Sequence, residues 1–311
     1  VIAVGMLFNS LDAYDLYYQA HVLARHVVIA RGAAFVLFMA VRVALILGEY
    51  SVVYFAAAST LEIALGSVFL LWTYRHSRSV KQRWFLDWTT MQRLLKDGWP
   101  LIISSALIII HTRLDQVMIG QMLDNAAVGI YSVAVRLSEV WLFIPALIVQ
   151  TLMPYFVKLR EPNTALYNAR LMQLYSIMFW LGVSMGLLTV IFGELLILRL
   201  FGEPYREAFL PLTLTIWTGV FISQALARGI WMVGENMQGY RLATNLIAVP
   251  INVALNWLLI PKYGVVGASA ASFVSIGLGT WVVPFLFKSM RASNKQMFAA
   301  INPKYLLRGA A

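Results

Sequence analysis

The chain has 311 residues, of which 60% are hydrophobic and 12% charged, and its mean hydropathy is +0.75. A soluble domain of this length has too little interior to bury so much apolar surface, so the composition excludes a soluble globular protein and indicates a membrane protein. The net charge of +10 does not require a nucleic-acid partner, because the cytoplasmic loops of membrane proteins carry excess Lys and Arg.

The chain begins with a short apolar run, Val1–Phe8, which is far below the about 20 residues that a spanning helix needs. The run lacks the basic start and the small-residue cleavage site of a signal peptide. We expect it to be the end of a helix, and we expect the chain to be truncated at its N-terminus.

Longer apolar runs follow, each with the length of a membrane-spanning helix and none with the alternation of a barrel strand. They predict an all-α fold, a polytopic membrane helical bundle. The predicted spans are Ala30–Leu47, Val52–Tyr74, Trp99–Gln121, Ala126–Phe156, Met172–Leu200, Glu207–Met232, Tyr240–Ile260 and Val265–Phe287.

Most of the 24 Lys and Arg residues gather on one side of the predicted bundle. They lie in the connections 9–29, 75–98 and 157–171, near the connection 233–239 at Arg241, and in the tail after Phe287. The opposite connections hold only Arg206 and Lys262, with Arg199 at a helix end. Because basic loops stay in the cytoplasm, this pattern predicts a cytoplasmic C-terminus.

The chain is predicted to have four parts, and the longest polar connection, residues 75–98, separates the first spans from the later ones. Residues 1–74 hold a helix stub and two spans, the remainder of an N-terminal lobe, and 75–98 form a basic cytoplasmic linker. Residues 99–287 form a complete six-helix C-terminal lobe, and 288–311 form a basic cytoplasmic tail. Aromatic residues alternate with cations in the linker, which indicates contact with membrane lipids rather than with nucleic acid.

Arg42, Arg113, Arg136 and Arg228 lie inside apolar runs. An Arg at the bilayer centre costs about 2.5–3.5 kcal/mol on insertion scales, so it faces the bundle interior or a wet cavity unless it reaches the interface. The first three fall near mid-membrane or in its outer half, where their guanidiniums would form a positive site suited to phosphate. Arg228 lies near the cytoplasmic boundary, and we expect its side chain to snorkel there.

Acidic residues offer an alternative interpretation of the same arginines. Glu139 lies one turn after Arg136 and could neutralise it, and Glu62 on the neighbouring helix could reach Arg42. Asp115 shares a helix face with His111, and it is either a proton or Na⁺ site or a counter-ion for Arg113 or Arg136. The sequence leaves both roles open.

Three amides inside the spans, Gln116, Gln224 and Asn256, could hydrogen-bond sugar hydroxyls, although bridging between helices is the alternative. The chain contains no Cys, and its four His residues lack the spacing of metal ligands on one helix. We therefore expect no catalytic residue, no metal site and no cofactor.

Several motifs in chain order resemble one transporter family. They are Tyr17–Ala20, Leu94–Leu101, Leu114–Gly120, Ala127–Ala134, Leu152–Pro154 and Asn256–Ala271. Together they are similar to the polysaccharide or O-antigen flippases of the MOP (multidrug/oligosaccharidyl-lipid/polysaccharide) superfamily, and the resemblance covers the whole chain.

This resemblance implies a MOP/MATE-like two-lobe transporter fold with the first lobe incomplete. It implies a multi-pass protein of the bacterial or archaeal cytoplasmic membrane that moves an undecaprenyl-pyrophosphate-linked oligosaccharide outward by alternating access, for surface polysaccharide synthesis. Ion exchange with H⁺ or Na⁺ is the expected drive, and polysaccharide assembly proteins are expected partners. The protein is then a transporter and not an enzyme.

Two other functions compete with this interpretation. A MATE-type multidrug exporter would present acidic and aromatic groups to cationic drugs, which the intramembrane arginines argue against. A membrane O-antigen polymerase or glycosyltransferase would need a large outer loop or a soluble catalytic domain, and the outer connections are short. A structural membrane subunit also stays open.

Overall fold

The computed structural model describes residues 8, 11–20, 24–76, 87–160, 164–235, 237 and 239–307, with the backbone alone for some helical residues such as 97–112. The described chain forms two compact units, 1–88 and 89–311, which are treated separately below. Residues 1–7 of the predicted helix stub, residues 77–86 of the predicted linker and the end of the tail lie outside the described residues. The assignment of the two units to transporter lobes therefore stays a prediction.

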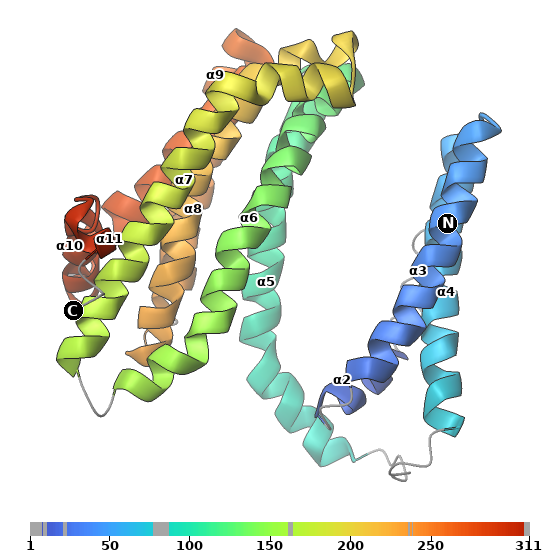
Figure 1. Cartoon of the computed structure of the whole chain (residues 1–311), viewed down its shortest axis with the longest axis horizontal. Helices are drawn as coiled ribbons and strands as arrows, with labels where there is room; N and C mark the ends of the chain where they lie inside the picture. The colour runs from blue at the N-terminus through green and yellow to red at the C-terminus, as the bar shows by residue number, and fades with distance from the viewer. Residues whose placement is uncertain are drawn as a thin grey trace. The chain divides into compact units, whose positions relative to one another are not determined.

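Long helices make up both units (Figure 1). The first unit contains α2 (Asp12–Ala20), α3 (Ala24–Leu47) and α4 (Val52–His76). The second unit contains α5 (Trp88–Met122), α6 (Asn125–Arg160), α7 (Thr164–Leu200), η2 (Glu203–Ala208), α8 (Phe209–Gly234), α9 (Gly239–Gly277), η3 (Leu278–Val282), η4 (Val283–Leu286), η5 (Lys288–Met290), α10 (Arg291–Ala299) and α11 (Lys304–Leu307).

Within the described chain, six helical segments are long and apolar enough to cross a membrane. Many of their large apolar side chains are exposed, including Val36 on α3, Val140 on α6 and Ile191 on α7. Exposed apolar surface of this extent marks contact with lipid. The prediction of an all-α, polytopic membrane bundle is confirmed.

The centre of the second unit is α8, which packs against α6, α7 and α9. Small residues allow a close contact between α7 and α8. A Cβ atom added at Gly182 would lie 2.8 Å from the Cα of Val220, and one added at Gly186 would lie 2.8 Å from the Trp217 ring. Glycines four residues apart are a common device for bringing membrane helices together, because lipid provides no hydrophobic force between them.

The segment Gly239–Leu286 contains 48 residues, too many for one crossing. It bends at Gly264, whose φ of 58° and ψ of −136° are outside the helical range and disfavour a side chain. The helical segments before and after Gly264 are the two arms of α9, and they pack closely. A Cβ atom added at Gly267 would lie only 2.3 Å from the Leu259 carbonyl oxygen, so the arms leave no room there for a side chain. This bend separates the last two predicted spans and makes them a helical hairpin.

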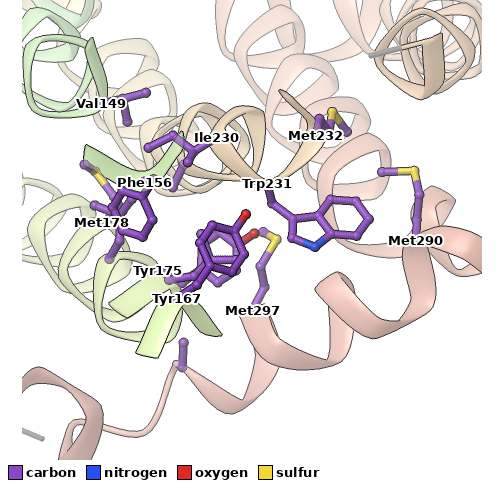
Figure 2. Close-up of a cluster of buried hydrophobic side chains, with 14 residues drawn as sticks. Val149, Phe156, Tyr167, Tyr175, Met178, Ile230, Trp231, Met232, Met290 and Met297 are labelled. Atoms are coloured by element: carbon purple, nitrogen blue, oxygen red, sulfur yellow. The ribbon is translucent and has the colours of Figure 1, made fainter. Parts of the chain in front are cut away.

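After the hairpin, the chain passes through a π-helical turn at Leu278–Val282 and returns to the bundle as α10. Met290 and Met297 join a buried cluster with Tyr167 and Tyr175 of α7 and Trp231 of α8 (Figure 2). A short polar helix is thus held against the bundle by apolar anchors.

Candidate functional site

A buried carboxylate lies where α5, α6 and both arms of α9 meet. Asp115 on α5 is 4% exposed. One carboxylate oxygen accepts hydrogen bonds from the Tyr131 hydroxyl at 2.7 Å and from the Ser272 hydroxyl, and the other accepts from Asn256 Nδ2 at 2.6 Å. Asn256 Nδ2 also donates to Asn252 Oδ1 at 3.2 Å, and Asn252 Nδ2 donates to Ser272 Oγ at 3.2 Å.

All three hydrogen-bond donors to Asp115 are neutral, and no described cation forms an ion pair with it. The amide oxygen of Asn256 is buried beside it and accepts no hydrogen bond from the described residues. A buried carboxylate with an unused acceptor next to it is costly unless a cation or a proton joins the group. The chemistry of this cluster, which we call the Asp115 cluster, suits a proton or a small monovalent cation.

Two other predicted residues form a positive group on α5 and α6. Arg113 Nη2 lies 3.5 Å from Glu139 Oε1, and Arg136 Nη1 lies 3.9 Å from Glu139 Oε2. One carboxylate therefore serves two guanidiniums, which leaves a net positive charge. The Arg113 side chain is 47% exposed and that of Arg136 is 76% exposed, so both can reach a ligand.

Arg42 is in a different situation in the first unit. Its Nη2 lies 2.5 Å from Glu62 Oε2 on α4 and donates to Ser59 Oγ at 3.2 Å. This is a one-to-one pair in which both side chains are partly buried. Glu62 thus neutralises Arg42, as the alternative interpretation of the sequence anticipated, and an anion would have to compete with Glu62 for it.

The predicted amides occupy different surroundings. Gln224 is fully buried, and its Oε1 accepts from Trp281 Nε1 at 2.7 Å. Asn256 is also fully buried and belongs to the Asp115 cluster, so the geometry supports helix bridging for both rather than sugar contact. Gln116 is partly exposed, and the side chain of His111 lies outside the described residues.

The expectation for Arg228 was wrong. Its side chain does not snorkel; Arg228 is 3% exposed, and Nη2 donates to Asn294 Oδ1 at 2.6 Å. Its Nε also contacts the Met297 sulfur at 2.9 Å. The sequence could not reveal this, because α10, which covers Arg228, returns to the bundle only in the tertiary structure.

Tyr131, Asn252 and Ser272 belong to the Asp115 cluster but are not among the site residues predicted from the sequence. Asn252 and Asn256 are four residues apart, which places both on one face of α9, and this spacing was the available signal. No feature of the sequence marks Tyr131 or Ser272 as a member of the cluster, since Tyr and Ser are ordinary residues of membrane helices.

Residues 1–160 match the family described as polysaccharide biosynthesis protein. The chain is 24% identical over 180 residues to the capsular polysaccharide biosynthesis protein CapF of Staphylococcus aureus, across 57% of this chain and 45% of the relative. It is 25% identical over 180 residues to the probable flippase AglR of Haloferax volcanii, across 55% of this chain and 36% of the relative. The matches thus span less than half of each relative, and no solved structure matches the chain.

Proposed function

Because the chain belongs to the polysaccharide biosynthesis protein family, we propose that it is a flippase that carries a lipid-linked oligosaccharide across the cytoplasmic membrane. The relative from Haloferax volcanii is named a probable flippase, which supports transport rather than catalysis. Carriage by alternating access, with the C-terminus in the cytoplasm, is part of this proposal. An undecaprenyl pyrophosphate carrier is the proposed lipid.

The observation that carries the proposal is the shared carboxylate between Arg113 and Arg136. Two exposed guanidiniums share one counter-ion, so an anion can bind both of them by displacing a single carboxylate. The planar guanidinium also pairs two phosphate oxygens at once. We assign the pyrophosphate of the substrate to Arg113 and Arg136, with Arg42 as a further candidate once it is released from Glu62.

The Asp115 cluster is the proposed coupling site. Uptake of H⁺ or Na⁺ would neutralise the Asp115 carboxylate. It would also give the buried Asn256 oxygen a partner, either the hydroxyl of the protonated carboxyl or the Na⁺ ion. The four helical segments that contribute to the cluster would then be held together more strongly. Glu139 is the second acid in this unit that could respond to substrate, since it would be freed when an anion takes Arg113 and Arg136.

The test replaces each arginine by alanine in the chromosomal gene and measures surface polysaccharide. We expect Arg113→Ala and Arg136→Ala to lower export by about tenfold or more, because a hydrogen bond to a charged group contributes about 1.5–3 kcal/mol. Protein levels in the membrane should stay normal. We expect Arg42→Ala to lower export as well, by removing the third candidate ligand.

Arg206→Ala is the matched control, since Arg206 already contacts two acids, Glu194 at 2.8 Å and Glu203 at 3.1 Å. It should leave export unchanged. Full polysaccharide production by both Arg113→Ala and Arg136→Ala would contradict the pyrophosphate site. Resistance to cationic drugs, lost on deletion of the gene while polysaccharide persists, would instead identify a multidrug exporter.

A further inference from the structure

A second positive site lies in the second unit, away from Arg113 and Arg136. A cavity of about 250 Å³ opens between α8, the first turns of α9 and the π-helical turn. Two arginines line it, Arg228 from α8 and Arg241 from α9. The proposed transport mechanism uses neither of them.

Arg228 carries a buried charge that its neighbours do not balance. The groups that its guanidinium contacts are Asn294 and Met297, which are neutral. In the described part of the chain, neither Arg228 nor Arg241 has a carboxylate within ion-pair distance. A buried cation without an anion is strongly unfavourable in a low dielectric, so an anionic ligand at this cavity would offset that penalty.

The remaining lining is amphiphilic. Thr244, Asn245 and Thr280 add polar groups beside the arginines, whereas Ile222 and Leu226 of α8 provide an apolar wall. A free anion could pair with the arginines but would not bury the apolar wall, and a hydrocarbon could bury the wall but would not pair with the arginines. A lipid with a phosphate headgroup can do both.

The depth of the cavity also fits a headgroup. Arg228 lies about two turns before the end of α8 at Gly234, and Arg241 lies in the first turn of α9. Both are therefore within about 10 Å of the connection between these helices, on the side that holds most of the cations. Basic pockets between spanning helices at the cytoplasmic side bind acidic lipid headgroups.

We propose that Arg228 and Arg241 form a binding site for the phosphate headgroup of a membrane lipid, whose acyl or prenyl chain lies along the apolar wall. The ligand is either an anionic phospholipid of the inner leaflet or a prenyl pyrophosphate. Asn294 links this site to α10, because it accepts from Arg228 and donates to the Trp281 carbonyl oxygen at 2.7 Å. The site does not depend on the flippase proposal, and lipid binding tests it separately from export.

The experiment measures lipid retention by native mass spectrometry on the full chain in detergent. The probes are phosphatidylglycerol, phosphatidylcholine, undecaprenyl pyrophosphate and inorganic phosphate, each offered alone. We expect phosphatidylglycerol, undecaprenyl pyrophosphate or both to be retained at least five times more than phosphatidylcholine. The better-retained probe identifies the source of the headgroup.

Two variants test the location. Gly229 lines the cavity, and no atom lies within 4 Å of a Cβ built on it, so Gly229→Leu should fill the cavity without changing any charge. Arg241→Gln removes the exposed charge and leaves the buried contacts of Arg228 intact. We expect each variant to lower retention at least fivefold.

Lys158→Gln is the control, because it removes an exposed cation from the end of α6 that does not line the cavity. It should retain lipid as the unaltered chain does. Unchanged retention in both Gly229→Leu and Arg241→Gln would overturn the proposal. The proposal would also be overturned if neither phosphatidylglycerol nor undecaprenyl pyrophosphate were retained more than phosphatidylcholine, or if inorganic phosphate alone were retained.

Discussion

Charged residues in this bundle differ mainly in how many opposite charges they meet. Arg42 has one acid to itself, whereas Arg113 and Arg136 share Glu139. Asp115 meets three neutral donors, and Arg228 meets an amide and a thioether. Since an unbalanced charge is costly in a low dielectric, the unbalanced groups are the ones at which a ligand gains most free energy by binding.

At this scale we predict the effect of Asp115→Asn. Asparagine has the shape of aspartate but no charge, so export should fall by about tenfold or more if Asp115 holds the coupling ion. The melting temperature in detergent should not fall, because the substitution removes a buried carboxylate without a cation partner. The two measurements together separate a coupling role from a structural one.

Asp124→Asn is the control for this substitution. Asp124 Oδ1 accepts from the Ala127 backbone N–H at 2.7 Å at the start of α6, and asparagine caps helices equally well. Export by this variant should match the unaltered protein. Normal export by Asp115→Asn, with unchanged dependence on Na⁺ and pH, would disprove the coupling assignment.

At the scale of elements, the bend of α9 assembles the Asp115 cluster. Asn252 and Asn256 precede Gly264 by two to three turns, and Ser272 follows it by about two turns, so the hairpin brings the three side chains level. The close contact at Gly267 sets the spacing of the two arms. A wider hairpin would take the Ser272 hydroxyl away from Asp115.

We therefore predict that Gly267→Ala is destabilising. The added methyl would meet backbone atoms of Leu259 that cannot rotate away, and overpacking of this kind costs about 1–3 kcal/mol. Thermal unfolding in detergent measures the loss. Gly129→Ala on α6, where no atom lies within 4 Å of the new methyl, should not destabilise. Equal melting temperatures for the two variants would show that the hairpin tolerates a wider spacing.

At the scale of the whole molecule, the cation distribution predicts one orientation in the membrane. The chain has no Cys, so a single introduced cysteine reports its own position without background. In intact cells, a membrane-impermeant maleimide should label Glu203→Cys and not Lys295→Cys. Permeabilised cells should label both, which controls for reactivity. The opposite pattern would invert the topology and place the Arg228 cavity at the outer side.

The fold class and the approximate positions of the helices follow from the sequence alone. The predicted spans fall largely on described helical segments, because the length of an apolar run is a local property that the bilayer thickness selects directly. The bounds differ, since α5 begins at Trp88 rather than at Trp99 and the last two predicted spans share α9. The candidate residues Arg113, Arg136 and Asp115 were also identifiable, since a charge within an apolar run is conspicuous in one dimension. Their depth and chemistry suggested an anion site and an ion site without any tertiary information.

The partners of these charges follow from the packing of the helices and not from the sequence alone. Asp115 meets Ser272, 157 residues later in the chain, and Arg228 is covered by Asn294, 66 residues later. Such pairs depend on the bend at Gly264 and on the return of α10 to the bundle. Hydrophobic periodicity specifies which segments enter the membrane but not which helix faces meet there. Which charged side chains have a counter-charge beside them therefore depends on the packing of the helices.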